Sequence, residues 1–262
     1  MTNENNNKVT IFVIATKSYG EYALNLINSS LKWTETNTQL EFILLRDQQV
    51  VSETRVSDSD SIVVKTFQIP SYGWPEATLL RFHLILDHWE HVTGEIVMYL
   101  DADTEIVAPL SFSDLSKANL NASSNGITPV LHPGYYNRSW ARNIMNRTRF
   151  GPWENNKNSS AFVPYKFREN YVCGGVFWGL KEAFHQLCTS LKVSVDHDLK
   201  LGIFAKHNDE SHLNSWLVNN PTFAASPEWA YADGYQNLSN LIPRVKVIHK
   251  PSSFVRTPTE SS

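Results

Sequence analysis

Ile96-Val-Met-Tyr-Leu-Asp-Ala-Asp-Thr104 joins five apolar residues to two aspartates, Asp101 and Asp103, that are separated by one alanine. A short apolar run bounded by polar residues predicts a buried β-strand. Open α/β sheets bind their ligands outside the carboxyl ends of the strands. This stretch therefore predicts an α/β sheet with a ligand site at the end of this strand.

The sequence before this strand alternates β-branched runs with helical patterns. Strands are predicted at residues 9–14, 40–45, 62–69 and 96–100, and helices at residues 21–33 and 76–91. This rhythm is typical of an α/β fold with a largely parallel sheet. In the helix predicted at 76–91, Pro75 fits the first position, and the core-facing residues are Ala77, Leu80, Leu84 and Ile85.

The pattern is looser after Thr104. Strands are predicted at residues 126–131, 171–178 and 245–248, and helices from Lys181 and from about Asn208, which fits the cap of the second helix. The helix from Lys181 presents one apolar face, made of Ala183, Phe184, Leu187, Cys188 and Leu191. Residues 137–168 form a long polar stretch, which predicts a functional lid or disorder. Because no repeat or clear linker occurs, a single domain is expected.

Bulk composition indicates an ordinary folded protein. The 262 residues are 42% hydrophobic and 12% aromatic, which is ample for a buried core. A formal net charge of -3 gives no general attraction to nucleic acid or anionic membranes, so an anionic ligand needs a local basic site. The two cysteines, Cys173 and Cys188, fit core packing in a reducing compartment. No stretch reads as a signal peptide or a membrane span, and a cytoplasmic location is expected.

The two aspartates carry the strongest chemical signal. Asp101 and Asp103 supply hard oxygen ligands for Mg²⁺ or Mn²⁺ and leave positions free for phosphate oxygens. Such a metal neutralises a diphosphate leaving group. Two alternatives stay open: acidic turn residues at a strand end, and the nucleophile loop of haloacid-dehalogenase-type phosphatases. Glu105 and the mid-chain position of the pair are atypical of that phosphatase loop.

Three further stretches are candidates. Asp209 and Glu210 fall in a predicted first helical turn, where acidic residues are common, but a transferase acting at an anomeric carbon also needs such a carboxylate. Cys173-Gly174-Gly175 interrupts a strand-like run, which indicates a bulge or a close approach of ligand to backbone. Lys250 and Arg256 are solvated terminal charges or partners for a diphosphate.

In this order, the stretches resemble glycosyltransferase family 6, which includes the ABO blood-group transferases and the animal α-1,3-galactosyltransferases. The resemblance runs from about Thr10 to Pro258, and Asp209-Glu-Ser-His-Leu-Asn214 is its most specific block. The other matching elements are Phe12-Val-Ile14, Trp74 through Arg81, Tyr99-Leu-Asp-Ala-Asp103, Leu131-His-Pro-Gly-Tyr135, Gly174-Gly175-Val-Phe177, Ser226-Pro-Glu228, and Lys250 with Arg256.

The resemblance implies a GT-A fold of α/β class in one domain at residues 9–258, after a flexible N-terminus at 1–8. A Rossmann-like nucleotide-binding half at about 9–107 would precede an acceptor-binding half and closing tail at about 108–258. It also implies a retaining α-1,3-glycosyltransferase dependent on Mn²⁺, with Mg²⁺ as the alternative ion. The donor would be UDP-N-acetylgalactosamine or UDP-galactose, and the acceptor a galactose-terminated glycan with or without fucose.

Family roles map onto residues of this chain. Asp101 and Asp103 would bind the metal, and Glu210 would be the catalytic carboxylate, as a covalent nucleophile or as the stabiliser of a front-face ion pair. His132 would contact the acceptor. The donor-binding residues would be Phe12, Val13, Ile14, Tyr19, Trp74, Arg81, Ala102, Cys173, Gly174, Gly175, Asp209, Lys250 and Arg256.

The chain departs from the family on the acceptor side. Lys206 stands where the animal blood-group enzymes have a tryptophan, so His207 is the nearest candidate, and the acidic residue beyond Ser226-Pro-Glu228 appears one position displaced, as Asp233. Two adjacent glycines leave space beside the donor sugar, so we expect N-acetylgalactosamine to be accepted, and even preferred. Besides the phosphatase, a non-catalytic glycan-binding protein with the same fold remains the alternative. No nucleic-acid partner and no transmembrane segment are expected.

Overall fold

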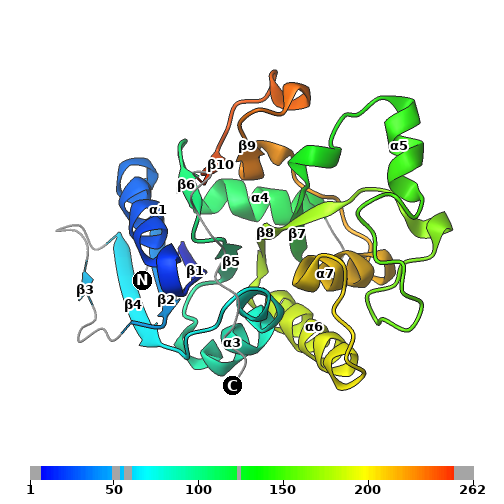
Figure 1. The fold of residues 1–262 in the computed structure, drawn as a ribbon. Helices are drawn as coiled ribbons and strands as arrows, with labels where there is room; N and C mark the ends of the chain where they lie inside the picture. Colours follow the sequence, from blue (N-terminus) through cyan, green and yellow to red (C-terminus); the bar gives the residue numbers. More distant parts are fainter. Residues whose placement is uncertain (1–6, 49–53, 56–60, 123–124, 251–262) are drawn as a thin grey trace.

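The computed structural model describes residues 7–48, 54–55, 61–122 and 125–250, and a seven-stranded sheet forms the centre of this part (Figure 1). The strand order is β3-β4-β2-β1-β5-β8-β7. Four neighbouring strands run parallel: β4 (Ile62–Gln68), β2 (Gln39–Arg46), β1 (Lys8–Ala15) and β5 (Ile96–Leu100). Antiparallel pairings add β3 (Thr54–Arg55), β8 (Val172–Leu180) and β7 (Ile127–Leu131). The predicted α/β class with a largely parallel sheet is confirmed.

A second, three-stranded sheet lies beside the end of β5. It consists of β6 (Thr104–Ile106), β10 (Val245–Val247) and β9 (Tyr231–Ala232), with β10 in the middle. The backbone N–H of Ile248, just after β10, donates to the carbonyl of Asp103 at 2.8 Å. This sheet therefore brings the last described residues of the chain to the aspartate pair.

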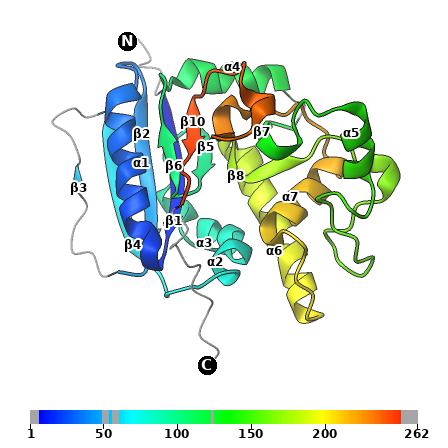
Figure 2. The ribbon, with the colours of Figure 1, turned by 45° about the horizontal axis from the view of Figure 1, so that its top comes forward.

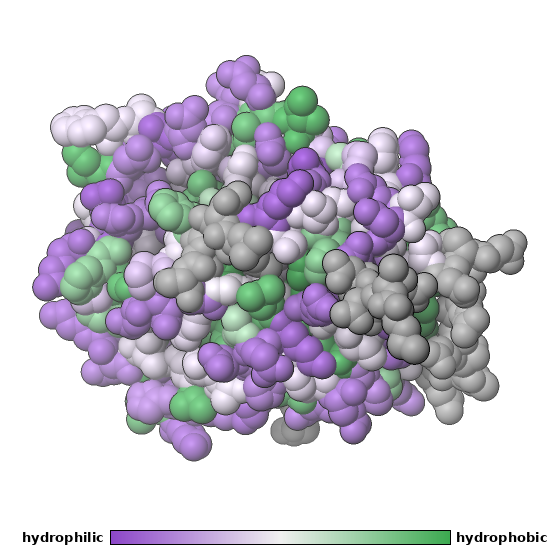
Figure 3. All heavy atoms as spheres, turned by 180° about the vertical axis from the view of Figure 1, so that it is seen from behind, coloured by the Kyte–Doolittle hydropathy of each residue, from purple (hydrophilic) through white to green (hydrophobic). Residues whose placement is uncertain are grey.

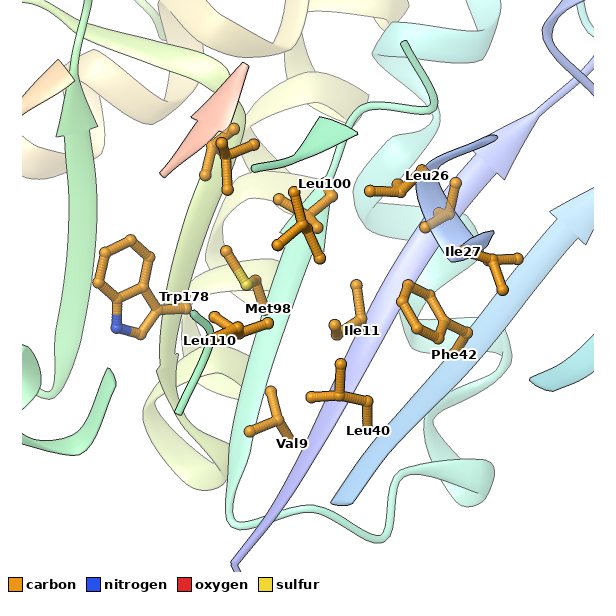
Figure 4. Packing of buried hydrophobic residues seen from close by; sticks show 14 of the residues in the cluster. Val9, Ile11, Leu26, Ile27, Leu40, Phe42, Met98, Leu100, Leu110 and Trp178 are labelled. Atoms are coloured by element: carbon orange, nitrogen blue, oxygen red, sulfur yellow. The ribbon is translucent and has the colours of Figure 1, made fainter. Parts of the chain in front are cut away.

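Helices cover both faces of the large sheet (Figures 1 and 2). On one face lie α1 (Gly20–Trp33) and α4 (Phe112–Ala122), and on the other lie α2 (Glu76–Leu79), α3 (Arg81–Asp87) and α6 (Lys181–Lys200). Side chains alternate between the two faces, because successive residues of a strand point in opposite directions. In β1, for example, Val9 and Ile11 pack toward α1 (Figure 4), whereas Phe12 packs on the opposite side.

Two short helices remain, α5 (Trp140–Arg147) and α7 (Asn208–Asn219). Within the described ranges, no helix is both long and apolar enough to cross a bilayer. Single 3₁₀ turns lie at Lys17–Tyr19, Trp89–His91, Pro133–Tyr135, Tyr165–Phe167, Pro227–Ala230 and Gln236–Leu238.

The helix predicted at 76–91 is broken into α2, α3 and a 3₁₀ turn. Leu80 and His88 leave helical geometry at the two breaks, with ψ angles of 4° and 18°. Each break shifts the phase of the apolar face, so Leu79 is buried in place of the predicted Leu80. Pro75 was predicted at the first helical position, but it is the N-cap residue of α2 and lies just before the helix. By contrast, α6 buries Phe184, Leu187, Cys188 and Leu191 as predicted. Both cysteines are free and buried.

The long polar stretch at 137–168 is folded, so the prediction of disorder is wrong. Arg168, the last residue of this stretch, is completely buried. Its side chain donates to three backbone carbonyls. These belong to Val163 at 2.8 Å, Glu154 at 2.9 Å and Thr148 at 3.0 Å. A buried guanidinium with several donors satisfies carbonyls that no regular ladder reaches. One arginine therefore holds the loop that follows α5 in shape.

Replacing Arg168 with alanine is expected to lower the free energy of unfolding by about 3 kcal/mol, because three buried carbonyls lose a charged donor. Urea denaturation followed by circular dichroism measures this change. Arg147→Ala, on the exposed surface of α5, is the matched control and should change stability by less than about 0.5 kcal/mol. Equal losses in the two variants would contradict this role of Arg168.

The predicted domain limits are only partly covered. Residues 1–6 of the N-terminal segment expected to be flexible lie outside the described residues, and β1 starts at Lys8. The division near residue 107 stays a prediction. Strands β7 and β8, from the second half of the chain, complete the large sheet of the first half.

Candidate active site

A cavity of about 610 Å³ opens where β1 and β5 end, and residues from both halves of the chain line it. Parallel neighbours end at the same sheet edge, so their following loops form a crevice there. Most of the residues predicted from the sequence lie on this wall: Ile14, Tyr19, Trp74, Arg81, Asp101, Ala102, Asp103, His132, Cys173, Gly174, Gly175, His207, Asp209, Glu210 and Lys250.

Three of the predicted site residues are placed away from this wall. The side chains of Phe12 and Val13 are fully buried in the two cores on either side of β1, because this central strand is covered on both faces. They do not line the cavity. The side chain of Asp233 is 67% exposed and pairs with Lys246 at 2.9 Å. The preceding residue, Ala232, lines the cavity instead. Arg256 lies outside the described residues.

Arg81 is the centre of the buried charge network. It starts α3, and its side chain is only 3% exposed. Its guanidinium contacts Asp209 at 2.8 Å and Asp101 at 3.0 Å, and it also donates to the carbonyl of Gly174. The ring of Tyr99 lies beneath it, 4.1 Å away. Burial opposes the charge, but Asp209, Tyr99 and Asp101 outweigh it, and the pKa of Arg81 is raised.

The aspartate pair is held from two sides. Asp101 accepts a hydrogen bond from the hydroxyl of Tyr99 at 3.0 Å, in addition to its ion pair with Arg81. Asp103 is buried and forms an ion pair with Lys250. Burial and the neighbouring charge of Asp101 raise the pKa of Asp103, while Lys250 acts in the opposite direction. The lysine therefore supplies a positive charge beside a carboxylate that is expensive to bury alone.

The two glycines of β8 form a bulge and also allow close contacts. The register of β7 and β8 jumps from Phe177 to Cys173 between Pro129 and Val130, so Gly174, Gly175 and Val176 are skipped. A Cβ atom on Gly175 would lie 2.5 Å from Oδ2 of Asp101. One on Gly174 would lie 3.1 Å from Cβ of Glu210. The predicted bulge is thus confirmed, and acidic side chains occupy the space beside the glycines. A close approach of ligand to this backbone stays a prediction.

Glu210 faces these glycines from the first turn of α7. Its Oε2 accepts the backbone N–H of Gly174 at 2.8 Å. Burial raises the pKa of Glu210 to about 7, against the hydrogen bond from Gly174, which lowers it. Burial likewise raises the pKa of Asp209 to about 6, although Arg81 opposes this. A carboxyl group whose pKa lies near neutrality inside a cavity is a candidate for catalysis.

A cluster of aromatic rings lies next to the cavity, and His132 and His207 of this cluster line its wall. The ring of Tyr171 lies 5.9 Å from that of His132 and 6.2 Å from that of His207, and the ring of Tyr135 lies 4.9 Å from that of His132. Burial, followed by the charges of His207 and Arg138, lowers the pKa of His132 to about 4. Its imidazole is therefore neutral at pH 7, and Nδ1 accepts the backbone N–H of Gly134 at 3.0 Å.

The start of α7 is fixed by one side chain of the helix itself and by one from outside it. The expected cap at Asn208 is wrong: His207 is the N-cap residue, and Asn208 has a φ of 47°. The N–H of His207 donates to the hydroxyl of Ser211 at 3.0 Å, and the N–H of Lys206 donates to the carboxylate of Glu154. Because Glu154 belongs to the loop shaped by Arg168, this loop supports the turn that carries Glu210.

Tyr99, Tyr171 and Glu154 were not recognised from the sequence. A signal existed for Tyr99, because residues two apart in a strand share a face, and Asp101 follows it at that spacing. Tyr171 precedes the glycine pair by three residues, but nothing local distinguishes it from a core tyrosine. Glu154 acts across 52 residues, and the sequence carries no local sign of this contact.

The aspartates suit a divalent cation that a ligand helps to hold. Asp101 and Asp103 present carboxylate oxygens at the cavity, which are the donors preferred by Mg²⁺ and Mn²⁺. The ammonium group of Lys250 already compensates the negative charge of Asp103. In the described part of the chain, no three His, Cys, Asp or Glu side chains converge into a complete site. A metal here would therefore take its remaining ligands from water and phosphate oxygens.

Comparison with known proteins gives one family. A family model described as glycosyltransferase family 6 matches residues 1–257. The O-antigen biosynthesis glycosyltransferase WbnI of Escherichia coli is 27% identical over 182 residues, covering 69% of this chain and 71% of that protein. Histo-blood group ABO system transferase 1 of Rattus norvegicus is 26% identical over 69% of this chain, which spans 48% of its length.

A third similar protein matches this chain over a shorter stretch. Globoside alpha-1,3-N-acetylgalactosaminyltransferase 1 of Gallus gallus is 32% identical over 105 residues, which cover 40% of this chain and 28% of that protein. The chain thus spans half or less of the length of these two animal relatives.

Proposed function

Because the chain belongs to glycosyltransferase family 6, we propose that it transfers N-acetylgalactosamine or galactose from the UDP-sugar to the 3-hydroxyl of a galactose-terminated glycan, with or without fucose, and retains the α configuration. One observation carries the proposal. The aspartate pair and Glu210 line one cavity, and the buried side chain of Arg81 between them pairs with Asp101 and with Asp209, the residue before Glu210. A phosphatase built on Asp101 has no support in this family. The cytoplasmic location stays a prediction.

The aspartate side of the cavity suits the leaving group. Asp101 and Asp103 would hold Mn²⁺, or Mg²⁺ as the alternative, and the ion when bound would neutralise the diphosphate. Lys250 adds a second positive charge at the same place, which stabilises a departing nucleoside diphosphate by charge-assisted hydrogen bonds. Ile14 and Tyr19, also on the wall, would contact the uridine.

The opposite side suits the sugars. Arg81 and Asp209 form a fixed ion pair beside the glycines, and they would position the hydroxyls of the donor sugar. Glu210 would face the anomeric carbon as a nucleophile or as the stabiliser of a front-face ion pair, and both roles need its ionised form. The neutral His132 and the neighbouring His207 would contact the acceptor galactose.

Donor preference depends on the bulge of β8. The absence of side chains at Gly174 and Gly175 supports acceptance of the larger N-acetyl group. The same space is partly used by Asp101 and Glu210, so the acetamido group would have to lie against these carboxylates. N-acetylgalactosamine as an accepted, and even preferred, sugar follows as our expectation.

An acceptor panel tests the function directly. Galactose-terminated glycans with and without fucose are incubated with UDP-galactose or UDP-N-acetylgalactosamine, each with Mn²⁺, with Mg²⁺ or with EDTA. We expect α-1,3-linked product that depends on the divalent ion, with N-acetylgalactosamine as an accepted donor. Turnover with UDP-galactose alone would contradict the donor assignment. Glycan binding without any product would favour the glycan-binding alternative.

Asp103→Ala is expected to abolish the stimulation of transfer by Mn²⁺, because the ion loses one of its two protein carboxylates. Initial rates measured over a Mn²⁺ titration give the result. The control is Asp87→Ala, an exposed aspartate on α3, which should keep the wild-type titration curve. An unchanged Mn²⁺ response in the Asp103 variant would remove this residue from the metal site.

A further inference from the structure

Helix α5 turns its apolar side chains toward solvent. Trp140 is 79% exposed, Met145 50% and Ile144 46%, and no residue of this helix is buried. A surface helix of a globular protein normally packs its apolar stripe on the core and shows polar residues to water. Here the orientation is reversed, which indicates that the apolar face has another partner.

The exposed residues form one continuous face. At 100° per residue, Trp140, Ile144, Ala141 and Met145 fall within an arc of about 140°. Arg147 and Arg142 lie beyond the two edges of this arc, by about 20° and about 60°. Phe150, 72% exposed, follows the helix, and the guanidinium of Arg149 lies over its ring at 4.8 Å. The face is therefore an apolar stripe bordered by arginines.

The charge of this region differs from that of the whole protein. Residues 137–150 contain no acidic residue and four arginines, Arg138, Arg142, Arg147 and Arg149. The complete chain carries a formal net charge of -3. A local basic patch on an acidic protein selects anionic partners at this place alone.

The helix stands at one end of the molecule. In both Figure 1 and Figure 2, α5 lies at the edge opposite β3 and β4. Seen from behind in Figure 3, the surface is mainly hydrophilic, with hydrophobic atoms in separate small patches. An extreme position lets the apolar face of α5 meet an extended flat surface without obstruction by the body of the protein.

We propose that α5 and Phe150 dock on an anionic lipid bilayer. The apolar side chains would enter the boundary between headgroups and acyl chains, while the flanking arginines pair with lipid phosphates. The composition fits this partner, because lipid-binding amphipathic helices combine bulky apolar residues with arginine or lysine on their borders. A second copy of the chain fits poorly, since a two-fold interface would place these arginines against themselves.

Vesicle flotation with the full chain tests this docking. We expect the protein to float with vesicles of phosphatidylcholine that contain phosphatidylglycerol, and to stay unbound with phosphatidylcholine alone. It should also stay unbound in 1 M salt, where the electrostatic screening length is only about 3 Å. The triple variant Trp140→Ser/Ile144→Ser/Met145→Ser should lower the bound fraction about tenfold or more, as should Arg142→Glu/Arg147→Glu. The matched control, Phe223→Ser/Ile242→Ser, changes residues that are 75% and 78% exposed elsewhere and should bind as wild type.

Several results would overturn the proposal. They are equal flotation of the wild type with both kinds of vesicle, no flotation with either, and wild-type flotation of both α5 variants. Sedimentation of the soluble protein gives a further check: a dimer that the triple variant abolishes would assign this face to a second copy. Circular dichroism establishes that the variants are folded, and the arginine pair tests the surface without touching apolar packing.

Discussion

Glu210→Ala is expected to lower kcat by about 10³-fold or more while the Kd for UDP changes only a few-fold. The carboxylate faces the glycine bulge, on the part of the cavity assigned to the anomeric carbon, and the aspartate pair assigned to the diphosphate is left intact. Its removal therefore affects the transition state far more than the nucleotide complex. Steady-state kinetics with calorimetric UDP titration separates the two effects.

Glu210→Gln and Glu169→Ala sharpen this experiment. The glutamine keeps the size of the side chain but cannot ionise, so it should be nearly as inactive as alanine. Glu169 is exposed and lies outside the cavity wall, and its variant should keep the wild-type rate. Near-normal turnover in either Glu210 variant would exclude it as nucleophile or stabiliser.

The raised pKa of Glu210 adds a dependence on pH. With a pKa of about 7 in the folded protein, the carboxylate required for catalysis protonates as pH falls through 7, and kcat should fall with it. Stability runs the other way. Because the pKa of Glu210 is raised above its ordinary 4.5, the protonated group stabilises the folded protein fully at pH values below 4.5. This stabilisation is lost as pH rises through about 7. Glu210→Gln should therefore gain stability relative to the wild type as pH rises.

Arg81→Ala is expected to be the most damaging single change in the site, with a loss of about 3–5 kcal/mol in stability and of most activity. It leaves Asp101 and Asp209 without their shared cation, and the latter is only 4% exposed. Thermal unfolding with and without UDP, together with kcat, measures both losses. Arg81→Lys should recover only part of them, because an ammonium cannot make the same forked contacts.

Arg244→Ala is the control for the loss of an arginine ion pair. Its partner Asp114 is 3.1 Å away, and about a third of each side chain is exposed. Such pairs contribute about 0–1 kcal/mol, so this variant should remain stable and active. If both arginine variants behaved alike, the charge network around Arg81 would not be the reason for its importance.

Local patterns predicted most of the fold. The strands around Val9–Ile14 and Ile96–Leu100 and the apolar face of α6 depend on periodicity, which the sequence displays directly. The breaks at Leu80 and His88 carry no glycine or proline. Tertiary contacts of the buried Arg81 and Phe82 decide that geometry, and propensity alone misses it.

The candidate site was predictable where a residue belongs to a motif and not where it depends on a distant pairing. The aspartates and Glu210 were found from their neighbours in sequence. The ion pair between Asp103 and Lys250 requires β10 to pair with β6, across more than half of the chain. In the same way, the support of α7 by Glu154 follows from a loop whose shape depends on one buried arginine.

The bulge in β8 affects both the proposed choice of donor sugar and the position of the charged side chains of the site. The N–H of Gly174 donates to Glu210, its carbonyl accepts from Arg81, and the carbonyl of Gly175 accepts the N–H of Asp101 at 2.8 Å. The backbone of two consecutive residues thus binds Glu210, Arg81 and Asp101 together. A change of side chain here to select another donor sugar would also displace these groups. Evolution or engineering of donor selectivity would therefore need compensating substitutions on α3 or α7, and single substitutions at this bulge should seldom give an active enzyme.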